Sequence, residues 1–139
     1  MKSGLSVVAL AVSFIAVSAS SRATCTQANL AGKWGVYVQS NGTNNYAIAC
    51  EVVINAKGAI SASNSGCAAT NGASSPVNGS LLLKSGSQCN YAGTVTLTAF
   101  GLKQTFLRST LTPDRGTLMG VGYEPASGVG YIFTMARMP

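Results

Sequence analysis

The ionisable residues of this chain give little material for catalysis. The sequence contains no histidine, the commonest general base and a frequent metal ligand. Its three acids are Glu51, Asp114 and Glu124. Asp114 lies in a Pro-Asp-Arg-Gly turn, Glu124 adjoins another turn, and Glu51 has the parity of an outward side chain in its predicted strand. Because no two acids share a predicted site, we expect a non-enzymatic protein with no catalytic residue, cofactor or metal.

Four cysteines are the remaining side chains with a chemistry of their own: Cys25, Cys50, Cys67 and Cys89. No pair has the C-x-x-C spacing of a zinc site, and no histidine accompanies them. An even number of cysteines in a short exported chain is typical of a disulfide framework. We therefore predict two disulfides and a secreted or periplasmic location.

The first 23 residues have the layout of a secretory signal peptide. A basic start at Lys2 precedes an apolar run over 5–17, and small residues follow up to Ala23. The apolar run is too short for a membrane span, so we predict cleavage instead. Cleavage is expected after Ala23, or else after Ala19. The former leaves a single domain over 24–139.

The charge of the mature chain does not indicate a nucleic-acid partner. The full sequence has nine basic and three acidic residues. Removal of Lys2 and Arg22 with the signal peptide leaves a net charge of 7 − 3 = +4. The remaining cations are scattered singly, whereas nucleic-acid binders gather theirs into a patch or stripe. We interpret this charge as a contribution to solubility.

Short strands between regular turn signals must position these residues. Apolar and polar residues alternate with a period of two, and no helical period stands out. An eight-strand meander can close into a barrel or fold into a sandwich, and short sequential turns favour an antiparallel up-and-down β-barrel. A loop over 65–76 is expected after the third strand. The predicted strands are 34–39, 46–54, 59–64, 77–83, 91–100, 105–111, 117–123 and 130–138.

The meander places the four cysteines at defined heights on the barrel. Cys25 and Cys89 fall at the end where the first strand begins. Cys50, on the second strand, and Cys67, just after the third strand ends, lie toward the opposite end. Four cysteines allow three connectivities. The pairs Cys25–Cys89 and Cys50–Cys67 require the least distortion of the backbone, and they are the predicted disulfides.

A Gly-x-Trp sequence opens the first predicted strand, and an arginine lies on the last. Gly32, Trp34 and Arg137, with the eight meandering strands, resemble the calycin superfamily of lipocalins, avidins, fatty-acid-binding proteins and small bacterial periplasmic metalloprotease inhibitors. The resemblance spans residues 30–138. It implies that Trp34 closes one end of the barrel and that Arg137 packs across its ring, which cation–π attraction favours. Biotin binding of the avidin kind requires further tryptophans that this sequence lacks.

The predicted interior leaves two kinds of partner open, a small apolar ligand and a protein. Tyr131 and Phe133 are candidate ligand contacts. Arg108 shares the parity of Phe106, so it points either inward, as an anchor for an anionic ligand, or outward. An interior above roughly 300 Å3 favours a ligand, and a filled barrel favours a protein partner. The apolar inward set is Trp34, Val36, Val38, Ile48, Val52, Ile54, Val95, Leu97, Tyr131, Phe133 and Met135.

The resemblance also implies an alternative function, periplasmic protease inhibition. In the small inhibitors the segment before the barrel blocks the protease. Here that segment comprises residues 24–29, and the predicted Cys25 disulfide tethers it. A loop at the mouth of the barrel is the other candidate for contact with a protease.

Overall fold

The computed structural model describes residues 24–40, 46–84 and 89–139, and the predicted signal peptide over 1–23 lies outside them. Within the described residues no helix is long and apolar enough to cross a membrane. Three short 3-10 helices are η1 (Gln27–Leu30), η2 (Ala62–Asn64) and η3 (Thr98–Phe100). The strands are β1 (Gly32–Ser40), β2 (Ala47–Ile54), β3 (Ala59–Ile60), β4 (Gly66–Ala69), β5 (Ser74–Leu83), β6 (Asn90–Leu97), β7 (Leu102–Leu111), β8 (Thr117–Tyr123) and β9 (Gly130–Arg137).

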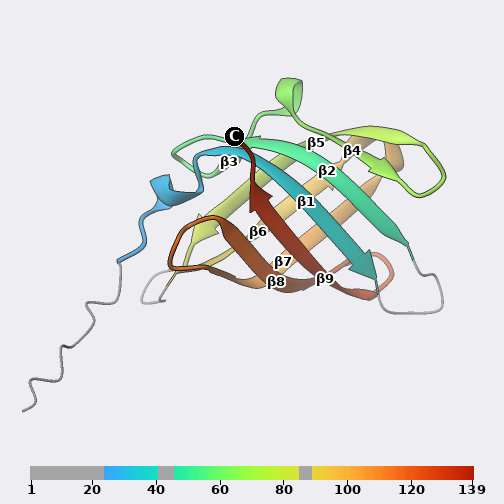
Figure 1. The fold of residues 1–139 in the computed structure, drawn as a ribbon. Coiled ribbons are helices and arrows are strands. Elements are labelled where there is room, and N and C mark those ends of the chain that lie inside the picture. The colour runs from blue at the N-terminus through green and yellow to red at the C-terminus, as the bar shows by residue number, and fades with distance from the viewer. Residues whose placement is uncertain (1–23, 41–45, 85–88) are drawn as a thin grey trace, which may run out of the picture.

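Antiparallel pairing carries the sheet round until it closes on itself. Each strand from β5 to β9 pairs with the next, β9 pairs with β1, and β1 pairs with β2. β3 and β4 share the place between β2 and β5, and each pairs with both. The wall therefore has eight members, with red β9 beside blue β1 where it closes (Figure 1). The predicted all-β, eight-stranded antiparallel up-and-down barrel is confirmed.

The third member of the wall differs from its prediction. The sequence predicts a strand over 59–64 and a loop over 65–76. In the structure β3 ends at Ile60, η2 follows it, and β4 and the start of β5 occupy most of the expected loop. Between those two strands only residues 70–73 remain as a turn. Alanine, serine and glycine dominate this stretch, and their low strand propensity explains the wrong prediction.

Tertiary contacts supply what local propensity lacks in β4. Cys67 lies directly opposite Cys50 of β2 and forms a disulfide with it. Just before β4, the Ser65 hydroxyl accepts a hydrogen bond from the Val53 amide at 2.9 Å. These links to β2 hold a stretch of small residues in the wall of the barrel.

Both disulfides join the predicted pairs. Cys25–Cys89 has a Cα–Cα distance of 5.0 Å and ties the segment before β1 to the start of β6. Cys50–Cys67 spans 4.0 Å between Cα atoms on adjacent strands, and both residues line the interior. One covalent link therefore secures the start of the chain, and the other secures the interrupted wall.

The inside of the barrel follows strand alternation. All eleven residues of the predicted inward set are buried. A bulge in β7 breaks the alternation, because Phe106 pairs with Gly122 and Arg108 pairs with Val121, which leaves Leu107 as an extra residue. Leu107 and Arg108 are consequently both exposed. The inward alternative for Arg108 is wrong, since the bulge shifts the parity of the strand by one residue.

The barrel has two ends, which we name after the residues they bury. The tryptophan end contains Trp34, near the start of β1, and the tyrosine end contains Tyr131, near the start of β9. The chain runs up and down between them, so described turns alternate between the ends. Turns 55–58 and 112–116 lie at the tryptophan end, and turns 70–73, 98–101 and 124–129 lie at the tyrosine end.

Candidate functional site

The tryptophan end is closed by a stacked pair. Trp34 is fully buried, and its indole Nε1 donates a hydrogen bond to the Leu30 carbonyl at 2.8 Å. The guanidinium carbon of Arg137 lies 4.4 Å from the centroid of the indole. A Cβ atom at Gly32, where φ is +135°, would stand 2.6 Å from Nη1 of Arg137, so glycine leaves room for that side chain. Trp34 and Arg137 thus occupy the places that the resemblance implies.

The Arg137 guanidinium is also bonded to the backbone around it. It donates to the carbonyls of Ala31 and Asn29, each at 2.6 Å, and to that of Arg115 at 3.2 Å. Three carbonyl partners fix the orientation of the guanidinium over the ring. The arrangement is a structural lid in which each guanidinium nitrogen donates one hydrogen bond.

The segment before β1 is folded onto the same end. The Gln27 side chain donates to the Leu81 carbonyl at 2.8 Å and accepts from the Leu83 amide at 2.6 Å. Buried Tyr91 donates its hydroxyl proton to the Thr26 carbonyl at 2.8 Å. These bonds and the Cys25 disulfide hold the segment that the inhibitor alternative would place against a protease.

The interior holds a narrow apolar cavity. Its volume is about 20 Å3, room for about one water molecule. Sites that enclose drug-sized ligands have about 300 Å3 or more. The interior is therefore filled in this conformation. The lining comprises Val36, Val38, Cys50, Val52, Ile60, Cys67, Val77, Leu81, Val95, Leu97, Gln104, Phe106 and Met135.

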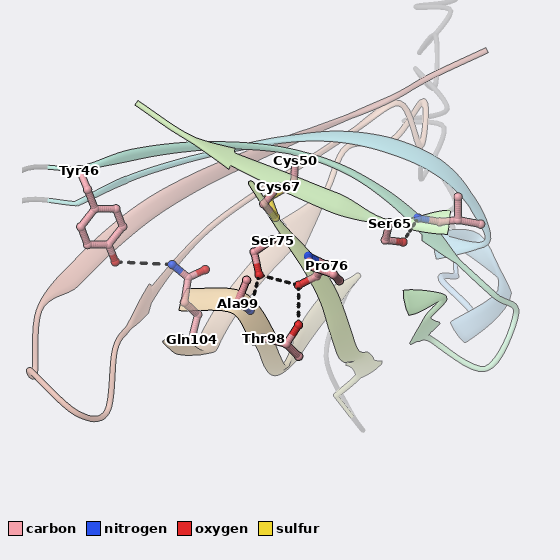
Figure 2. The surroundings of a disulfide bond; sticks show 10 residues. Tyr46, Cys50, Ser65, Cys67, Ser75, Pro76, Thr98, Ala99 and Gln104 are labelled. Carbon is pink, nitrogen blue, oxygen red and sulfur yellow. Dashed lines mark hydrogen bonds between the residues drawn. A yellow bond between two sulfur atoms is a disulfide. The ribbon is translucent and has the colours of Figure 1, made fainter. Parts of the chain in front are cut away.

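One lining residue, Gln104, is polar and almost completely buried. Only 2% of its surface is exposed, and its Nε2 approaches the Tyr46 hydroxyl at 3.5 Å, the limit of a hydrogen bond. Figure 2 shows the Tyr46 ring, just before β2, with its hydroxyl directed at the Gln104 amide from across the barrel. A buried amide held by one long bond retains capacity for a better partner.

Tyr131 is another buried polar residue of the tyrosine end. It is 3% exposed, and its hydroxyl has no hydrogen-bond partner among the described residues. The ring lies over Gly122, where a Cβ atom would stand 2.4 Å from the hydroxyl oxygen. It also meets Phe106 edge to face, with ring centroids 5.7 Å apart. Tyr131 does not line the cavity itself, but its ring contacts Phe106, which does.

Burial raises the pKa values of Tyr131 and Tyr46. Removal from solvent raises the pKa of Tyr131 far above its ordinary value, and the nearby Tyr46 adds to the effect. Burial likewise raises the pKa of Tyr46, against a smaller opposing contribution from its Gln104 hydrogen bond. Both hydroxyls therefore carry a proton at neutral pH, and that of Tyr131 is free to donate.

A rigid frame surrounds this region. The Ser75 hydroxyl, which is buried, donates to the Pro76 carbonyl at 2.9 Å and accepts from the Ala99 amide at 2.8 Å. Thr98 bonds the same Pro76 carbonyl at 3.3 Å, which ties η3 to β5 beside the Cys50–Cys67 disulfide (Figure 2). The predicted strand over 91–100 ends at Leu97 because η3 turns here to make these bonds.

The structure brings some predicted site residues together and separates others. Tyr131 and Phe133 are inside, and both pack edge to face against Phe106. Arg108 is outside and contributes nothing to the interior. Gln104 was not predicted, because the expected strand began one residue after it. Its parity with Phe106 is the signal that would have identified it.

The three acids lie in three separate places. Glu51 points outward and pairs with Lys33 at 2.8 Å, while Glu124 accepts a hydrogen bond from Ser127 at 3.0 Å. The Thr112 hydroxyl and then the Gly116 amide bond the Asp114 carboxylate and lower its pKa. No group of three His, Cys, Asp or Glu side chains suited to a metal ion occurs among the described residues.

Large apolar side chains are also exposed on the outer wall. Val121 and Ile132 are directly paired on β8 and β9, and Leu107 lies beside Val121 at the bulge of β7. Each of the three is about half exposed. A shallow groove of about 540 Å3 continues from Leu107 across β6 to Leu82 of β5, which is also half exposed. The outer wall thus offers an apolar surface on adjacent strands.

Comparison with known proteins identifies the fold and no family. No family model matches the sequence, and no curated protein sequence matches it. A de novo designed fluorescence-activating β-barrel is similar in structure, with 12% identity, a TM-score of 0.63, and coverage of 79% of this chain and 94% of that one. The redesigned β-barrel mFAP1, bound to DFHBI, has 11% identity, a TM-score of 0.62, and coverage of 81% and 98%. At these identities the likeness shows the barrel fold alone.

Proposed function

We propose that this protein is an exported, non-enzymatic barrel that binds a small, largely apolar molecule inside its tyrosine end. The observation that carries the proposal is the buried Tyr131 hydroxyl, which has no hydrogen-bond partner among the described residues and whose ring contacts the cavity-lining Phe106. An unsatisfied buried polar group costs about 1–3 kcal/mol, and each such group in a folded protein calls for an explanation. A ligand that accepts a hydrogen bond from this hydroxyl supplies one. Calycin-like ancestry, implied by Trp34 and Arg137, belongs to the same proposal.

The likeness to designed barrels supports the proposal at the level of architecture. A barrel of this size in the mFAP1 structure is bound to the small molecule DFHBI. Eight strands enclose just enough space to be filled by side chains or to hold one small ligand. In this chain, side chains fill the space in the present conformation, so a ligand must displace some of them.

The side chains best placed to move aside for a ligand are at the tyrosine end. Tyr46 is only partly buried, and its bond to Gln104 is 3.5 Å long. Movement of the Tyr46 ring toward solvent therefore breaks one weak hydrogen bond and uncovers Gln104. Even an engineered cavity of about 150 Å3 is enough for a ligand the size of benzene.

The methionines provide a direct test. Met135 lines the cavity and is 1% exposed, whereas Met119 is on the outer wall and 53% exposed. We would label methionine methyl groups with 13C and titrate the purified protein with acetophenone and with ethylbenzene. Interior binding shifts the Met135 signal and leaves that of Met119 in place. If neither compound moves Met135 up to its solubility limit, the proposal is wrong.

A second candidate is a protein partner on the outer wall, favoured by the filled interior and the adjacent, half-exposed Leu107, Val121 and Ile132. A photo-crosslinking residue at Ile132, in protein expressed in its own host, should capture one defined partner. The matched control is Asn78, an exposed residue of β5 on the far side of the barrel. Equal capture at both positions would contradict a specific surface.

A further inference from the structure

The buried polar groups of the interior are all uncharged. Among the described residues, those that are polar and buried are serines, Gln104 and the tyrosines, and no lysine, arginine, aspartate or glutamate joins them. A buried ion without a partner of opposite charge costs far more than a neutral polar group. An anionic or cationic ligand would meet no counter-charge inside. The interior therefore selects against charge.

The unpaired Tyr131 hydroxyl determines that the ligand must offer a hydrogen-bond acceptor. A protonated tyrosine hydroxyl donates one hydrogen bond, and at Tyr131 that proton has no acceptor. The hydroxyl is held in place, because the ring is packed between Gly122 and Phe106. It cannot swing out to reach solvent without leaving both contacts. An acceptor must therefore come to the hydroxyl.

The surroundings define the rest of the ligand. Phe106 packs edge to face on both Tyr131 and Phe133, with the Phe133 ring centroid at 4.4 Å. Such aromatic edges and faces favour a flat or aromatic body. Gln104, on the same strand as Phe106, adds a buried amide to the cavity lining.

Building on the proposed function, we infer that the ligand is an uncharged aromatic or similarly flat molecule whose carbonyl or other neutral acceptor oxygen takes the hydrogen bond of the Tyr131 hydroxyl. The class includes neutral aryl ketones, esters and amides, and it excludes carboxylates and amines.

Three compounds that share a benzene ring test this inference independently of the proposed function. Acetophenone carries a neutral acceptor, ethylbenzene has nearly the same shape without one, and benzoate carries a negative charge. In the wild-type protein, acetophenone should bind about tenfold more tightly than ethylbenzene, since one good hydrogen bond to an otherwise unpaired group is worth about that factor. Benzoate should bind more weakly than either. The readout is the Met135 methyl signal.

Tyr131→Phe removes the donor and keeps the ring. We expect this variant to bind acetophenone and ethylbenzene about equally, with its affinity for ethylbenzene unchanged from the wild type. Tyr123→Phe is the matched control, because Tyr123 lies on neighbouring β8 and is 36% exposed. It should leave both affinities unchanged.

Each other result has a definite meaning. Equal binding of acetophenone and ethylbenzene to the wild type, with shifts at Met135, keeps the proposed function and overturns this inference. Tighter binding of benzoate also overturns it. No shift with any compound overturns both. Destabilisation of the ligand-free protein by Tyr131→Phe would show that the hydroxyl already has a partner, and this too contradicts the inference.

Discussion

The barrel buries a tyrosine at each end, and the two are satisfied differently. Tyr91 is fully buried at the tryptophan end, and its hydroxyl bonds the Thr26 carbonyl. Tyr131 is buried at the other end, and within the part of the chain that the structure describes its hydroxyl has no hydrogen-bond partner. Tyr91 shares its end with the completed contacts of Trp34 and Arg137. Complete pairing is the mark of a structural plug, and a single missing partner distinguishes the end at which we propose that a ligand binds.

Removing the plug should have the largest effect on stability. Trp34→Ala deletes a fully buried indole together with the surface on which Arg137 rests, and we expect the free energy of unfolding to fall by about 5 kcal/mol. Urea denaturation measures it. Tyr37→Ala, on the outer face of the same strand, should change stability by less than about 1 kcal/mol. A similar loss from both variants would mean that Trp34 is no plug.

The two disulfides should rank by the loops they close. Replacing Cys25 and Cys89 with alanine opens a loop of 64 residues, and replacing Cys50 and Cys67 opens one of 17. Loop entropy predicts losses of about 4 and about 3 kcal/mol respectively. Urea denaturation of both double variants at one pH gives the comparison. A larger loss for the second pair would show that its role in holding β4 outweighs loop entropy.

Adding a methyl group under Tyr131 should disturb the tyrosine end. A Cβ atom at Gly122 would stand 2.4 Å from both the Thr105 carbonyl and the Tyr131 hydroxyl. We expect Gly122→Ala to cost about 2 kcal/mol and to weaken acetophenone binding, because the ring must shift. Gly66→Ala is the control, since the nearest atom there is 3.7 Å away. Unchanged binding in Gly122→Ala would place the ligand elsewhere.

Replacing either of the two buried tyrosines by phenylalanine should change stability less, and the two changes should differ. Tyr91→Phe should cost about 1 kcal/mol, because the Thr26 carbonyl loses the Tyr91 hydroxyl and keeps only the Asn29 amide. Tyr131→Phe should cost nothing or stabilise slightly, because no bond is lost. Thermal unfolding without ligand measures both. Equal losses would remove the distinction between the two ends.

The smallest expected effect is on the pH dependence of stability in alkaline solution. Burial raises the pKa of Tyr131, so the unfolded chain loses this proton near pH 10 while the folded chain retains it. The unfolded state then binds fewer protons, and this contribution to stability, complete below pH 10, is lost as the pH rises further. Tyr131→Phe should flatten the decline measured above pH 10. Tyr123→Phe should not, and an equal flattening would contradict the assignment.

Alternation along the strands was enough to predict the barrel, its disulfide pairs and its inward apolar set. Local rules failed where tertiary contacts decide. The Leu107 bulge reversed the direction of Arg108, and β4 formed from small residues because Cys67 binds it to β2. The candidate site was half predicted: Tyr131 was named, but Gln104 lay one residue outside its expected strand. That a particular hydroxyl lacks a partner is a property of the packed interior, which residue order does not express.

The Cys25–Cys89 bond also has a consequence for the rate at which the barrel closes. The closing pair of β1 and β9 joins Trp34 to Arg137, which are 103 residues apart in the chain (137 − 34). With the disulfide formed, the shortest covalent path between them falls to about 57 residues, which lowers the entropy cost of closure by about 0.5 kcal/mol. The oxidised chain should therefore form its final strand pair about twice as fast as the reduced one. A disulfide that lies outside the β1–β9 pair thus speeds the pairing of these two strands.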